Sequence, residues 1–157
     1  MMDTLTWLEN SGFATWIRTS PSIWAYPTIL TLHTLGLAVL VGANWALDLR
    51  LLGVAKAIPL QTLSPSFRVM WIGFWVNFVS GVLLFAADAT TKGTTTVFMV
   101  KLALIAVGVA LIVLTRRTVY GRGAKAPTID ATARLLAAGS LLVWIVAIAA
   151  GRLMAYL

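Results

Sequence analysis

Four long runs of apolar residues dominate this chain, and its polar residues gather in the segments between them. The runs cover roughly residues 23–47, 68–88, 96–115 and 130–154. Each matches the ~20 residues that a helix needs to cross the apolar core of a bilayer. Because the connections are short, consecutive spans are expected to run in opposite directions. The pattern predicts an all-α integral membrane protein, an up-down antiparallel four-helix bundle that forms a single domain over residues 1–157.

The segment before the first span has a different pattern. Residues 3–18 mix aromatic and aliphatic side chains with polar ones, and Gly12 interrupts them. Trp7 and Trp16 suit the headgroup level of a bilayer, where tryptophan is enriched. We therefore expect a short interfacial segment that lies along the membrane surface.

Composition supports a membrane protein and narrows the chemistry. Charged residues make up 11% of the chain, less than half of the ~25% that is typical of soluble domains. There is no cysteine, which excludes disulfides, thiolate metal sites and cysteine nucleophiles. The motifs of serine hydrolases, zinc hydrolases and phosphate-binding loops are absent from the sequence as well.

The net charge of +7 is distributed unevenly between the loops. Eight of the twelve basic residues lie at the first and third connections, and four lie on the opposite side. The positive-inside rule therefore places these two connections in the cytoplasm and both termini outside, in a bacterial inner membrane. An anionic lipid surface accounts for the basic loops, so we expect no nucleic acid partner. The eight are Arg50, Lys56, Arg68, Arg116, Arg117, Arg122, Lys125 and Arg134, and the four are Arg18, Lys92, Lys101 and Arg152.

Several polar side chains within the spans are expected to meet in the outer half of the bundle. Ionisable groups in a membrane are costly and usually functional. At 1.5 Å per residue, His33 and Asn77 both lie about 15 Å below the outer surface. Lys101 and Arg152 lie about 8 Å below it. Together with neighbours on the face of His33, the candidate site residues are His33, Lys101, Tyr26, Gly36, Asn77 and Arg152.

Each of these residues also has a structural interpretation. His33 could hydrogen-bond a neighbouring helix, and Asn77 could hold two helices together. Lys101 and Arg152 could extend to the outer interface without a partner. At the span ends, Asp48 with Arg50 and, separately, Asp88 are expected to form structural ion pairs. The candidate partners are Arg68 or Arg116 for Asp48, and Lys92 or Lys101 for Asp88.

The only histidine, His33, is the best candidate for a metal ligand. Imidazole nitrogen binds haem iron well, and haem prefers an apolar crevice between helices. Lys101 could supply a second axial nitrogen or pair with a haem propionate. One chain cannot supply two histidine ligands, although a homodimer that shares His33 across a symmetry axis could.

Two family resemblances add to this interpretation. Much of residues 20–117 resembles an uncharacterised family of bacterial four-helix membrane proteins, whose acidic residue three positions before the histidine is replaced here by Leu30. The overall plan is also similar to copper-resistance D-type membrane domains and to HemJ-type membrane-bound protoporphyrinogen oxidases. That second resemblance implies haem b, with roles for His33 and Lys101. The first resemblance rests on Tyr26, Pro27, His33, Gly36, Gly42, the run 48–53 (DLRLLG), Ser80, Gly81, the run 85–89, Phe98, Lys101 and Leu102.

The sequence thus predicts a membrane protein that binds one haem b in the outer half of its bundle and serves electron transfer or another membrane-linked redox step. A non-enzymatic membrane subunit or assembly factor is one alternative, and a transporter of small molecules or metal ions is another. The lipid bilayer is the expected partner, and a homodimer or a larger membrane complex stays open.

Overall fold

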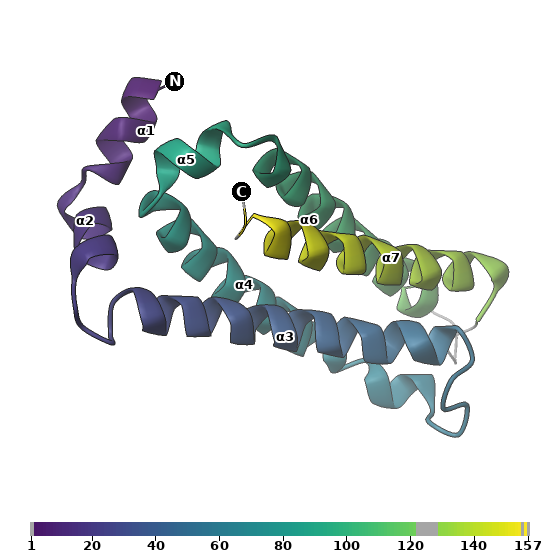
Figure 1. Ribbon diagram of the computed structural model, residues 1–157. Helices are drawn as coiled ribbons and strands as arrows, with labels where there is room; N and C mark the ends of the chain where they lie inside the picture. Colours follow the sequence, from purple (N-terminus) through teal and green to yellow (C-terminus); the bar gives the residue numbers. More distant parts are fainter. Residues whose placement is uncertain (1, 122–128, 155, 157) are drawn as a thin grey trace.

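The computed structural model describes residues 2–121, 129–154 and 156, and every regular element in this described part is a helix. Two antiparallel hairpins make up the bundle (Figure 1): the first pairs α3 with α4, and the second pairs α6 with α7. Contacts between α3 and α7 join the hairpins. The prediction of an all-α antiparallel four-helix bundle is therefore confirmed. The long helices are α3 (Tyr26–Leu51), α4 (Ser66–Ala86), α6 (Thr96–Thr115) and α7 (Ala131–Leu153).

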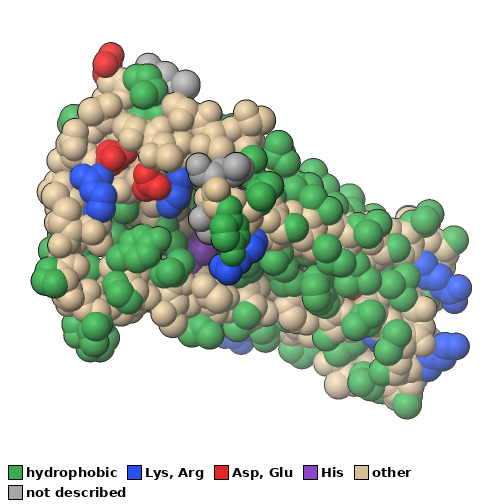
Figure 2. All heavy atoms as spheres, viewed as in Figure 1, with side chains coloured by type: hydrophobic (Ala, Val, Ile, Leu, Met, Phe, Trp, Pro, Cys, Tyr) green, Lys and Arg blue, Asp and Glu red, His purple; other side chains and the backbone are tan. Residues whose placement is uncertain are grey.

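All four long helices are long and apolar enough to cross a membrane. In Figure 2, hydrophobic side chains cover the length of the bundle, while charged side chains gather near its two ends. Many large apolar side chains point outward, including Ile72 and Leu142, which are 56% and 64% exposed. Lipid is the solvent that such a surface requires. The chain is a multi-pass membrane protein with four spans.

Shorter elements connect the spans and define the two ends of the bundle. Between α4 and α6 lies the short helix α5 (Ala89–Thr94). At the opposite end, the 3-10 helix η1 (Leu60–Leu63) precedes α4, and α6 continues into the π-helical turn η2 (Arg116–Tyr120). We call these the α5 end and the η1 end. The α5 end corresponds to the side that the charge pattern predicts to be outside.

Glycine brings the backbones of α3 and α4 into direct contact. A Cβ atom added to Gly36 would lie 2.7 Å from the amide nitrogen of Asn77. One added to Gly73 would lie 2.6 Å from the amide nitrogen of Leu40. Only glycine fits at such a crossing, which is how membrane helices often pack closely without help from the hydrophobic effect.

The main core belongs to the η1 half of the bundle. It draws on α3, α4, α6, η2 and α7, and Trp144 of α7 is fully buried with its indole ring beneath Gly108 of α6. A smaller cluster at the α5 end contains residues of α2, α3 and α4 only. The hairpins therefore share a core of buried residues at the η1 end, whereas at the α5 end the rings of Phe85 on α4 and Phe98 on α6 stack with centroids 5.1 Å apart. Members of the main core include Leu40, Leu47, Leu51, Phe67, Met70, Ile112, Val119, Ala137 and Trp144.

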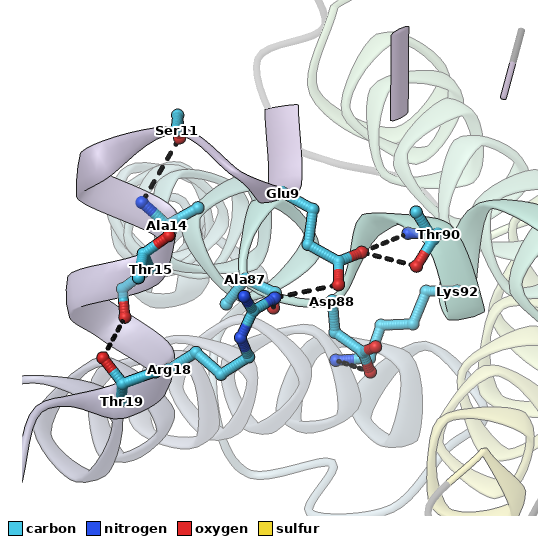
Figure 3. A network of polar contacts seen from close by, with 10 residues as sticks. All are labelled: Glu9, Ser11, Ala14, Thr15, Arg18, Thr19, Ala87, Asp88, Thr90 and Lys92. Atoms are coloured by element: carbon cyan, nitrogen blue, oxygen red, sulfur yellow. Dashed lines mark hydrogen bonds and ion pairs between the residues drawn. The ribbon is translucent and has the colours of Figure 1, made fainter. Parts of the chain in front are cut away.

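The expected interfacial segment forms two short helices, α1 (Met2–Glu9) and α2 (Gly12–Thr19), that cover the α5 end. Figure 3 shows the polar contacts that hold α1 and α2 to this end of the bundle. The Glu9 carboxylate accepts from the amide and hydroxyl of Thr90 at 2.8 and 2.6 Å, and it pairs with Arg18 at 2.8 Å. These bonds from Thr90, with a smaller contribution from Arg18, lower the pKa of Glu9. Trp7 and Trp16 stay exposed, as an interfacial position requires.

Candidate functional site

The imidazole of His33 faces α4. Its Nδ1 lies 3.0 Å from the backbone carbonyl of Asn77 and 3.2 Å from Ser80 Oγ. Because a carbonyl oxygen only accepts, Nδ1 must donate, and in the neutral ring Nε2 then carries a free lone pair. Ser80 donates its own proton to the carbonyl of Val76 at 2.6 Å, so it too can accept from Nδ1. The bonds thus fix both the ring orientation and the tautomer that a ligating Nε2 requires.

A small residue makes room for this ring. A Cβ atom on Gly81 would lie 3.0 Å from His33 Cε1. Asn77 completes the arrangement by donating its side-chain amide to the backbone carbonyl of His33 at 2.7 Å. His33 and Asn77 thus bond to one another in both directions between α3 and α4. Among the described residues, the Nε2 atom of His33 has no hydrogen-bonding partner.

Lys101 approaches this region from the second hairpin. Its side chain packs against α7, where a Cβ atom on Gly151 would lie 3.4 Å from Lys101 Cε and 3.5 Å from its Nζ. Within the described part of the chain, Lys101 forms no ion pair. Figure 2 shows Lys and Arg side chains close to the histidine at this end of the molecule.

The other candidate residues lie elsewhere around the α5 end. Tyr26 is exposed in the first turn of α3, two turns from His33. Gly36 faces the α4 backbone, so its small size serves helix packing in this structure. Arg152 is exposed, donates to the Tyr156 hydroxyl at 3.3 Å and lies over that ring. The structure thus brings His33 together with Asn77 and near Lys101, but it does not bring Tyr26 into contact with them.

The charged span ends differ in part from expectation. Asp88 forms an ion pair with Lys92 at 3.6 Å. The ion pair expected for Asp48 is absent from the described residues, because its carboxylate turns inward to the side chain of Asn44, 2.6 Å away. Arg50 instead donates to two backbone carbonyls of the following loop, those of Lys56 and Ile58. The prediction of an ion pair at Asp48 was therefore wrong.

The donor set around His33 fits an axial ligand to haem. It offers an oriented neutral imidazole nitrogen and, on the other hairpin, a lysine that could pair with a carboxylate. The described residues contain no group of three His, Cys, Asp or Glu side chains that could hold a bare metal ion. Sequence reasoning did not include Ser80 and Gly81 among the candidate site residues. Sequence reasoning also missed Gly151. This glycine lies against the side chain of Lys101, and nothing in a single sequence indicates that contact.

One protein-family model covers nearly the whole chain. Residues 4–157 match a family of unknown function, DUF6644, and the chain belongs to that family. No curated protein and no solved structure matches the chain.

Proposed function

For this member of a family of unknown function, we propose that the α5 end binds one haem b, with His33 Nε2 as an axial ligand. The single observation that carries the proposal is the hydrogen bond from Nδ1 to the Asn77 carbonyl at 3.0 Å. Histidines that bind metals almost always donate their other ring nitrogen in this way. Bound haem would supply one-electron redox chemistry in the membrane, and the protein would serve electron transfer or a membrane-linked redox step.

The chain's own residues would bind and orient the group. Asn77 and Ser80 hold the ring of His33, and Gly81 leaves space beside it. Lys101 is the candidate partner for a propionate or a second ligand.

Haem titration of the purified protein in detergent tests the proposal. We expect the wild type to bind one haem per chain and His33→Ala to lose the Soret band. Thr34→Ala is the matched control, because Thr34 is the adjacent residue on α3, is exposed and bonds only to its own helix at Leu30. Equal haem binding by His33→Ala and the wild type, or none by the wild type, would refute the proposal.

A non-enzymatic membrane subunit is the second candidate, and the bonds of His33 to α4 favour it too. In that case His33 would only join the helices. His33→Asn separates the two functions, because asparagine can still donate to α4 but is a poor haem ligand. If His33 only joins the helices, His33→Asn should be as stable as the wild type and should function like the wild type in cells. A haem role predicts a folded protein that has lost the pigment.

A further inference from the structure

A second polar cluster lies inside the bundle in its η1 half, away from His33. Asp48 and Asn44 of α3 are 1% and 2% exposed, and Ser140 of α7 is 1% exposed. The amide nitrogen of Asn44 lies 2.6 Å from Asp48 Oδ2 and 2.7 Å from Ser140 Oγ. Because Asn44 and Asp48 are four residues apart, they project from one face of α3. The carboxyl group therefore sits between the two hairpins, where the haem proposal gives it no role.

This carboxyl group has no compensating cation among the described residues. Arg50 on the same helix is bonded to loop carbonyls, and the guanidinium of Arg116 lies over the Phe67 ring at 5.8 Å. Tyr120 of η2 donates its hydroxyl to the carbonyl of Leu60. An ionised carboxylate buried without a partner in a membrane protein is costly. The remaining charged residues that the structure describes in this region are exposed: Lys56, Arg68, Arg117, Asp130 and Arg134.

The cluster can satisfy this carboxyl group in both protonation states. When it is ionised, the amide of Asn44 donates to it, and the hydroxyl of Ser140 can donate as well. When it is protonated, it needs an acceptor, which the amide oxygen of Asn44 supplies after the amide turns over. Among the described residues, Asp48 has no group of further carboxylate or histidine side chains with which it could hold a metal ion. The donors and acceptors of Asn44 and Ser140 thus suit a carboxyl group that gains and loses a proton.

We propose that Asp48 is a proton-binding site within the membrane and that its proton controls the contact between α3 and α7. The cluster is placed for such control. Asn44 shares its amide between Asp48 and Ser140, and so it links the two hairpins. At the α5 end, no side-chain hydrogen bond of the described residues joins α3 or α4 to α6 or α7. If protonation of Asp48 turns the Asn44 amide over, it therefore changes one of the few polar contacts between the two hairpins.

Infrared spectroscopy of the protein in lipid nanodiscs over a pH series tests the site. We expect a protonated-carboxyl band in the wild type that changes with pH, is lost in Asp48→Asn and remains in Asp88→Asn. Asp88 is the matched control, because it is a carboxylate at the opposite end that is paired with Lys92. Ser140→Ala keeps Asp48 but removes a bonding partner, so it should move the midpoint of the same band. Identical bands at every pH in the wild type and Asp48→Asn would overturn the proposal.

A distance measurement tests the control of the hairpins. The chain has no cysteine, so spin labels can be placed by Thr31→Cys on α3 and Ala149→Cys on α7, both exposed positions of the α5 half. The distance distribution should change with pH in the otherwise wild-type chain and stay constant with Asp48→Asn. The same pH dependence in both would overturn the coupling. Neither measurement needs haem, so a failure here is distinct from a failure of the proposal on His33.

Discussion

Gly36→Ala tests whether backbone contact between α3 and α4 supports the fold and the position of His33. The added Cβ would lie 2.7 Å from the Asn77 nitrogen, 3.0 Å from the Gly73 carbonyl and 3.1 Å from Asn77 Cα. All three atoms belong to the α4 backbone, so no flexible side chain can move aside. Ordinary contact begins at 3.4 Å. The two helices must therefore separate by about 0.7 Å, the difference between these distances.

The energetic cost follows from three contributions. Overpacking of this kind costs about 1–3 kcal/mol. Separation also weakens the two bonds between His33 and Asn77, which are worth about 0.6 kcal/mol each in a membrane. Alanine returns about 1 kcal/mol, because it favours a helix more than glycine does. We expect Gly36→Ala to lower the free energy of unfolding by about 1–3 kcal/mol and to weaken haem binding, since the ring of His33 loses its supports.

Unfolding in mixed detergent micelles, followed by circular dichroism, measures this difference. Gly42→Ala is the control, because Gly42 lies six residues further along α3 with no atom within 4 Å of an added Cβ. This control should leave stability unchanged or raise it by up to about 1 kcal/mol. If the two variants unfold at the same denaturant concentration, the backbone contact is not what holds α3 to α4, and the reasoning fails.

Three further predictions concern other parts of the molecule. The lowered pKa of Glu9 means that its stabilising contribution is complete above its ordinary pKa of 4.5 and is lost as pH falls through the lower pKa of the folded state. Glu9→Gln should mimic the protonated form, and limited proteolysis would detect the release of α1 from the bundle. Gly108→Ala should lower the free energy of unfolding by up to about 2 kcal/mol, because its Cβ would lie 2.9 Å from the buried Trp144 ring, which costs about 1–3 kcal/mol, while alanine returns about 1 kcal/mol. Gly139→Ala, with open space around its Cβ, should not lower it, and thermal unfolding compares the two variants. In intact cells, Asp3→Cys should react with a membrane-impermeant maleimide and Lys56→Cys should not. The reverse result would invert the predicted topology.

The spans could be predicted from the sequence because lipid imposes a simple rule on length and composition. Observed boundaries fall within a few residues of the expected ones, as with Tyr26–Leu51 against 23–47. Depth was also predictable, since the rise per residue of a helix is constant. Equal depth correctly suggested that His33 and Asn77 could meet, and the structure shows the bonds between them.

Rotation and partner choice could not be predicted in the same way. Asn44 shares a face of α3 with His33, yet it bonds to α7 while His33 bonds to α4. Which neighbour a residue meets depends on the packing of whole helices, which one sequence does not reveal. The error at Asp48 has the same origin, because its partners were inferred from the basic residues at the same end of the bundle. Its side chain turns inward to Asn44, which also bonds to Ser140, 92 positions beyond Asp48 in the sequence.

The reduced-minus-oxidised absorption spectrum of the wild-type protein, purified from haem-replete cells, tests the central claim most directly. The account predicts the sharp bands of a b-type haem at a ratio of one per chain. A protein that is pure, folded and helical but colourless, and that stays colourless when haem is added, would contradict it.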